Sequence, residues 1–222
     1  MLMRKYLLTL FTVLSVSCLG QDWIRYEIDS AVTVTIPGNF QVTDTLGQRY
    51  IVAQVDNGLI LIAIIENEGK HAINIEDEED LTKYYKGFVD GFIKSQKGQL
   101  IKDEIVDFNG LKLLRFSFKA SLGEEKQLRH CLSVFVNDKN YAINFWELES
   151  MTDEMISVRE RLFNSIELEA SLTMKNQMSY SVEGTRTYRI GYFIGRGLGS
   201  ILIIAVLALV VAWIIRRGRR RE

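Results

Sequence analysis

The chain has 222 residues, of which 47% are hydrophobic and 25% are charged, and its formal net charge is −1. This composition excludes an intrinsically disordered protein, and the length is sufficient for a domain with its own core. The charge is unevenly distributed, because residues 21–190 carry 19 Lys and Arg against 27 Asp and Glu, a net charge of −8. Such an acidic region argues against nucleic acid or anionic lipid as its ligand.

The first twenty residues have the pattern of a secretory signal peptide. Arg4 and Lys5 form a short basic region, and the apolar run over residues 6–16 is too short to span a bilayer. We expect cleavage after Gly20. Two alternatives stay open, namely an uncleaved anchor and lipidation of Cys18 after cleavage before it.

An α+β domain is expected over residues 21–170, and most of it has β-strand patterns. The expected strands are residues 23–28, 31–36, 50–55, 59–65, 101–108, 111–120, 128–136 and 141–148. Turn signals such as Asp56-Asn57-Gly58 and Asn109-Gly110 join neighbouring strands as hairpins, which predicts an antiparallel sheet of six or more strands. Because residues 59–65 are apolar on both faces, we place them at the centre of a covered sheet.

Two amphipathic helices interrupt the strands, over residues 80–96 and 152–166. Their apolar residues recur at helical spacing, and Thr152 or Ser150 is the expected N-cap of the second helix. The expected core includes Trp23, Ile36, Phe40, Leu61, Phe88, Phe92, Phe116, Phe145, Phe163 and Ile166.

The two ends of this domain resemble PsbP-like domains. Trp23-x-x-Tyr26 and Val34-x-Ile36-Pro37-x-x-Phe40-x-Val42 are similar to the aromatic pair and the proline turn that open these domains. The segment 163–168 is similar to their closing strand. The resemblance covers roughly residues 22–170. It implies an antiparallel sheet flanked by helices on both faces, an α/β/α sandwich, and a binding or assembly module rather than an enzyme. No site residue of the family carries over.

Motifs of catalytic or metal sites are absent from the sequence. His71 and His130 do not have the spacing of metal ligands, and the alternation around His130 predicts a packed strand residue. The acidic run 76–80 is typical of a helix start rather than of a calcium loop. Cys131 lies in a strand pattern, which favours a small buried residue over a nucleophile. We therefore predict no enzyme, and no catalytic, cofactor or metal residue.

An envelope hydrolase that uses acidic residues is the alternative from a different class. Glu147 and Glu149 are two residues apart, so they would share one face if both lay on one strand. A purely structural spacer is a third alternative.

The C-terminal part predicts a membrane anchor. Residues 171–190 are polar and aperiodic, as in a tether, and residues 191–215 are expected to form a transmembrane helix. Its stretch from Gly197 to Ile215 has 19 uncharged residues, which span about 28 Å as a helix. The basic tail 216–222 marks the cytoplasmic end. Its topology signal consists of Arg216, Arg217, Arg219, Arg220 and Arg221.

Three glycines at the start of this helix form one face. Gly191, Gly195 and Gly199 recur every fourth residue, and such a face lets two helices approach closely. It predicts association of the membrane helix with a second copy or with another spanning protein. The alternative is that small residues are merely common in such helices, and Gly197 lies on a different face.

Together these patterns predict a single-pass membrane protein whose N-terminal domain lies outside the cytoplasm, in the periplasm if the cell has two membranes. The domain is expected to bind or assemble with a partner that the sequence does not identify.

Overall fold

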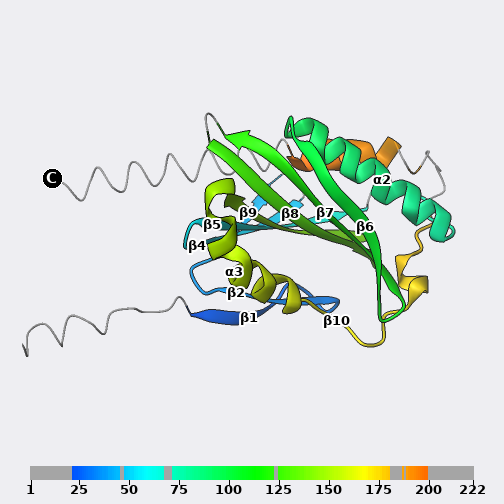
Figure 1. The fold of residues 1–222 in the computed structure, drawn as a ribbon. Coiled ribbons are helices and arrows are strands. Elements are labelled where there is room, and N and C mark those ends of the chain that lie inside the picture. Colours follow the sequence, from blue (N-terminus) through cyan, green and yellow to red (C-terminus); the bar gives the residue numbers. More distant parts are fainter. Residues whose placement is uncertain are drawn as a thin grey trace, which may run out of the picture.

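The structure of the chain, a computed structural model, describes residues 22–45, 48–67, 72–122, 125–180, 187 and 189–199 (Figure 1). Three predictions fall outside the described residues. They concern the expected signal peptide, which includes Cys18, the residue His71, and the sequence from Ser200 to the arginine tail.

A seven-stranded antiparallel sheet forms the centre of the domain. In spatial order its strands are β3 (Gln41–Thr45), β4 (Gln48–Val55), β5 (Gly58–Glu66), β9 (Lys139–Leu148), β8 (Glu125–Val136), β7 (Leu111–Leu122) and β6 (Gln99–Phe108). The hairpins predicted from the turn signals are confirmed. β5 is an internal strand and is buried on both faces, which confirms the interpretation of its continuous apolar run.

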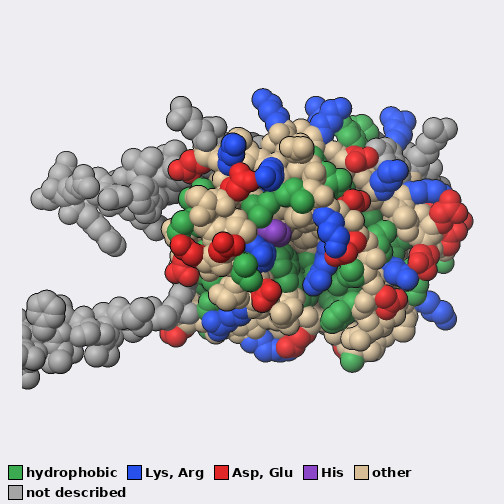
Figure 2. Space-filling model, in the orientation of Figure 1, with side chains coloured by type: hydrophobic (Ala, Val, Ile, Leu, Met, Phe, Trp, Pro, Cys, Tyr) green, Lys and Arg blue, Asp and Glu red, His purple; other side chains and the backbone are tan. Residues whose placement is uncertain are grey.

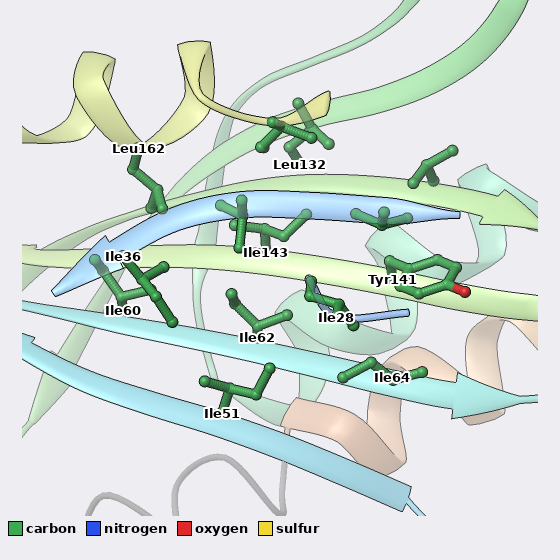
Figure 3. Close-up of a cluster of buried hydrophobic side chains, with 14 of the residues drawn as sticks. Ile28, Ile36, Ile51, Ile60, Ile62, Ile64, Leu132, Tyr141, Ile143 and Leu162 are labelled. Atoms are coloured by element: carbon green, nitrogen blue, oxygen red, sulfur yellow. The ribbon is translucent and has the colours of Figure 1, made fainter. Parts of the chain in front are cut away.

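The large sheet confirms the predicted antiparallel sheet of six or more strands, but the first two strands do not belong to it. β1 (Trp23–Glu27), β2 (Val32–Pro37) and β10 (Glu167–Leu168) form a separate three-stranded antiparallel sheet with β2 in the middle. The reason is the burial of β2, whose Val34 and Ile36 pack across one face of the large sheet. Figure 3 shows Ile36 next to Ile60 of β5, and Ile28 between Ile62 of β5 and Tyr141 of β9.

Helices cover both faces of the large sheet, as the resemblance implied. α2 (Glu78–Ser95) packs on one face, while α3 (Thr152–Asn164) and the small sheet pack on the other (Figure 1). The side chain of Asp77 caps α2 by accepting a hydrogen bond from the amide of Asp80 at 2.9 Å. Acidic residues in the first turn favour the helix dipole, so the acidic run serves the helix start.

The two faces have cores of different composition. Aromatic side chains fill the α2 side, and they are Tyr50, Tyr84, Tyr85, Phe88, Phe92, Phe116, Phe118, Phe135 and Trp146. Aliphatic side chains dominate the α3 side (Figure 3). Most of the expected core residues are buried, and the exceptions, Trp23, Phe40 and Phe163, are half-buried.

The first half of the expected tether belongs to the domain instead. Residues 171–180 include the short helix η4 (Met174–Gln177), and Ser179 forms a β-bridge with Ile75. The buried side chain of Gln177 accepts a hydrogen bond from the amide of Lys112 at 2.8 Å and donates to the carbonyl of Phe135 at 3.0 Å. The segment is fixed because these bonds satisfy buried backbone groups of β7 and β8.

Residues 189–199 form a helix that packs beside α2 (Figure 1). Within the described ranges, no helix combines the length and the apolarity that crossing a membrane requires. The first nine residues of the expected membrane helix, 191–199, lie beside α2 in this structure.

Candidate functional site

A pocket of about 350 Å³ opens on the α3 face, between α3 and strands β6, β7 and β8. The small sheet and α3 cover the other part of this face. Figure 2 shows the hollow, in which a histidine lies between basic and acidic side chains. Among the described residues that histidine is His130.

The strand register brings the polar lining together. Ser117 of β7 is paired with Lys102 of β6 on one side and with His130 of β8 on the other. Glu104 and Arg115 form the pair two residues further along the same two strands, and therefore on the same face. Since directly opposed residues of antiparallel strands point to the same face, all five side chains belong to the pocket side of the sheet.

A buried carboxylate lies beneath the pocket. The side chain of Glu147 on β9 is fully buried, and its Oε1 accepts a hydrogen bond from Nη1 of Arg159 on α3 at 2.6 Å. Nε2 of His130 lies 3.3 Å from the same Oε1 and 3.3 Å from Nη1 of Arg159. Depending on the tautomer, this nitrogen either donates to Glu147 or accepts from Arg159.

This network fixes the side chains of Arg159 and His130, which face the cavity. The side chains of His130 and Arg159 are each 19% exposed, whereas Glu147 is not exposed at all. Oε2 of Glu147 has no hydrogen bond to any described residue. Because a buried charge needs close partners, Glu147 holds Arg159 and His130 in place at the floor of the pocket.

The lining offers hydrogen-bond donors to an anionic group. Lys102 is paired with Glu104 at 2.6 Å, but the guanidinium of Arg115 makes no hydrogen bond or ion pair with another described residue. Arg159 shares its guanidinium between Glu147 and the cavity. A guanidinium presents several donors in a fixed plane, which suits a carboxylate or a phosphate.

The structure tests two interpretations of single residues. His130 lies on β8 and its side chain is mostly buried beside Glu147 and Arg159, as the alternation predicted, but it also borders the pocket. Glu147 and Glu149 do not form a carboxylate pair on one strand, because β9 ends at Leu148. Glu149 instead begins the short helix η3 (Glu149–Met151) and pairs with Lys119.

Within the described part of the chain, no cluster of three or more His, Cys, Asp or Glu residues is arranged to hold a metal ion. Cys131 is buried, and its burial raises the pKa of the thiol well above the usual value. A raised pKa keeps the thiol protonated at neutral pH, and a thiol is a weaker nucleophile than a thiolate.

Gly191, Gly195 and Gly199, the glycines singled out in the sequence, pack against α2 of the same chain. A Cβ atom built on Gly191 would overlap the carbonyl oxygen of Tyr84, and one built on Gly195 would overlap that of Phe88. A Cβ atom on Gly199 would lie 3.1 Å from the carbonyl oxygen of Phe92. The contacts advance in the same direction on both helices, so the two helices run parallel with almost no space between their backbones.

α2 contributes a glycine of its own, Gly91, to this contact. Gly87 and Gly91 have the same four-residue spacing, and a Cβ atom on Gly91 would overlap the carbonyl oxygen of Tyr192. The sequence interpretation missed this pair. Its signal was a Gly-x-x-x-Gly repeat within an amphipathic helix, which matched the repeat at Gly191.

Arg129 connects the ends of both helices to the sheet. It is buried, lies 3.7 Å above the ring of Trp146, and bonds to the side chain of Gln96, which follows α2. Gln96 in turn donates from Nε2 to the carbonyl oxygen of Gly199 at 2.5 Å. Burial lowers the pKa of Arg129 to about 10, so the guanidinium stays protonated at neutral pH.

No protein-family model matches the chain, and no curated protein matches its sequence. The fold is similar to that of the cyanobacterial PsbP from Synechocystis, with a TM-score of 0.50 and 15% identity, over 69% of this chain and 97% of the other. Two further solved structures are more distant. The Ran-binding protein Mog1p of Saccharomyces cerevisiae has a TM-score of 0.42 and 8% identity, over 72% of this chain and 100% of the other. LpqN of Mycobacterium tuberculosis, a protein involved in cell envelope biogenesis, has a TM-score of 0.39 and 10% identity, over 66% and 90%.

The likeness to the cyanobacterial protein supports the PsbP-like fold that the short motifs predicted. At this level of identity it concerns the fold alone, and residues of the pocket have to be interpreted from their own chemistry.

Proposed function

We propose that this chain is a membrane-anchored, extracytoplasmic binding module, and that the pocket beside α3 takes a small anionic ligand. The observation that supports this most is the placement of Arg159 and His130 at the pocket floor by a fully buried Glu147. A buried charge network is costly, so its position beneath an open cavity favours a binding role.

The anchoring half of the proposal rests on the sequence. An N-terminal signal pattern, the apolar run that ends at Ile215 and the arginine cluster after it agree on one orientation. In that orientation the pocket lies outside the cytoplasm.

The ligand class follows from the lining. Lys102, Arg115 and Arg159 oppose Glu104 and Glu160, and Lys102 is already paired with Glu104. This leaves Arg115 and the outer part of Arg159 as donors. A cavity of this size takes a small molecule, and the shared chemistry of its ligands is a carboxylate or a phosphate group.

We expect citrate or inorganic phosphate to raise the melting temperature of the full chain in detergent micelles. Arg159→Gln should remove this rise, because the guanidinium that pairs with the anion is lost. Arg161→Gln is the matched control, since Arg161 lies on the same helix but over the ring of Trp23, at 4.5 Å. The measurement is thermal unfolding with and without each anion. An equal rise in the wild type and in Arg159→Gln would contradict binding at this pocket, as would no rise with either anion.

One observation favours a second candidate function, an acyl hydrolase. Ser117, His130 and Glu147 lie on three neighbouring strands and on one face of the sheet, with Ser117 directly opposite His130. The order serine, histidine, carboxylate is that of a catalytic triad. No hydrogen bond joins Ser117 to His130 in the described structure, and such a bond is what activates a serine.

We therefore expect a fluorophosphonate probe to label wild type and Ser117→Ala to the same low extent. The measurement is the mass of the intact protein after incubation with the probe. Labelling of the wild type that Ser117→Ala abolishes would favour the hydrolase over the binding module.

A further inference from the structure

We propose that the turn between α2 and β6, residues 94–101, contacts the headgroup layer of the bilayer that anchors the chain. We call these residues the tip. The inference rests on the proposed membrane anchoring and adds a surface of the domain to it. Close helix packing, the sequence that follows it and the chemistry of the tip support the proposal.

The packing fixes the end of helix 189–199 beside the tip. The two helices touch at the glycines, so any separation of the helices would break this packing. The hydrogen bond of 2.5 Å from Gln96 to the carbonyl of Gly199 places a residue of the tip level with the end of helix 189–199. Since the helices run parallel, both end on the same side of the domain.

The sequence that follows Gly199 brings the membrane close to this side. After Ser200, residues 201–215 are uncharged and apolar. If the uncharged run from Gly197 to Ile215 spans the bilayer, the hydrocarbon core begins within about one helical turn of Gly199, about 5 Å. The headgroup layer on each side is about 5–8 Å thick, so the tip lies at its depth.

The composition of the tip suits that layer. Lys94 and Lys97 are exposed, no acidic residue occurs between positions 94 and 101, and the net charge of +2 contrasts with the acidic domain. Leu100 is 40% and Ile101 is 50% exposed. Lysines that reach phosphates beside aliphatic side chains that enter the interface are typical of membrane-contacting surfaces.

Two backbone features present these side chains outward. The pairing of β6 with β7 shifts between Leu100 and Lys102, and such a bulge leaves Ile101 without a partner on β7 and turns it outward. Lys97 has a φ of 50°, in the left-handed region where glycine or asparagine would cost less. A lysine is therefore less favourable than glycine or asparagine in the backbone conformation at position 97.

The test uses the full chain with Cys18 and Cys131 replaced by alanine and reconstituted into phosphatidylcholine vesicles with or without phosphatidylglycerol. A fluorophore on Ile101→Cys is compared with one on Ile105→Cys, an exposed position on the same strand. Four residues along a strand correspond to about 13 Å, which exceeds the depth of the headgroup layer. A nitroxide on the lipid headgroup should quench the label at position 101 at least about threefold more strongly than the label at 105.

A second variant tests the charges. Lys94→Gln with Lys97→Gln should lower the quenching at position 101 in vesicles with phosphatidylglycerol to the level seen without it. A chain that floats with the vesicles but shows equal quenching at both positions would overturn the tip contact and leave the anchor intact. If both labels are shielded, so that the nitroxide quenches neither of them, a second copy of the chain lies along β6 instead. A chain that does not float would refute the anchoring itself.

Discussion

Gly195→Leu is expected to detach helix 189–199 from α2 and to lower the free energy of unfolding by about 3–5 kcal/mol. A Cβ atom at position 195 would overlap the carbonyl oxygen of Phe88 and lie 2.8 Å from the amide nitrogen of Phe92. Both are backbone atoms, so no change of rotamer relieves the clash. Detachment also exposes Ile190 and Leu198, which are buried in the aromatic core.

The matched control is Gly197→Leu on the same helix. No atom lies within 4 Å of a Cβ atom built on Gly197, and the residue is exposed, so its replacement should change stability by less than about 0.5 kcal/mol. Unfolding in urea, followed by circular dichroism, compares the two variants at equal concentration. Similar stabilities would mean that helix 189–199 does not depend on its glycine face.

This contact bears on the association predicted for the glycine face. The structure places Gly191, Gly195 and Gly199 on a helix of the same chain. Association with a second copy or with a spanning protein stays a prediction, and it would require the face to leave α2. The two contacts are therefore alternatives rather than simultaneous.

Phe88→Ala is expected to lower the free energy of unfolding by about 3–5 kcal/mol, the usual range for a buried phenylalanine. Phe88 is fully buried, and its ring centroid lies 5.8 Å from that of Phe92 and 6.2 Å from that of Phe116. Removing the ring leaves a cavity between α2 and the sheet. Because the Phe88 backbone also faces Gly191 and Gly195, the surroundings have little freedom to close it.

Lys86→Ala is the control for this substitution, since Lys86 is an exposed residue of the same helix. Its replacement removes no core contact and should cost less than about 0.5 kcal/mol. Urea unfolding again gives the difference. A loss below about 1 kcal/mol for Phe88→Ala would show that the aromatic face of α2 contributes little to the core.

Much of the fold was predictable because local patterns determine it. Period-two alternation and turns such as Asp56-Asn57-Gly58 specify hairpins, and the apolar spacing around Phe88 specifies α2. The separate small sheet was not predictable in this way. β2 has the same alternation as any half-buried strand, and only packing decides whether it extends the large sheet or crosses it.

The candidate site was harder to predict from the sequence than the fold, because its residues come together only in the tertiary structure. Arg159 lies on a helix and Glu147 on a strand, and neither has a local pattern that points to the other. The His130 alternation suggested packing, since it contains no information about what covers that face. The spacing of Gly191, Gly195 and Gly199 did identify a face for close helix packing, but spacing does not specify which helix packs there.

The pairing of α2 with helix 189–199 also has a consequence for the timing of synthesis. The two partners of the hydrogen bond between Gln96 and Gly199 are separated by 103 positions. At about 5–20 residues per second, α2 waits roughly 5–20 s after its own synthesis before its partner helix exists. During that interval the glycine face of α2 and part of the aromatic core are uncovered. The nascent domain therefore passes through a period in which chaperones can bind its uncovered surface. This period ends only when helix 189–199 packs against α2.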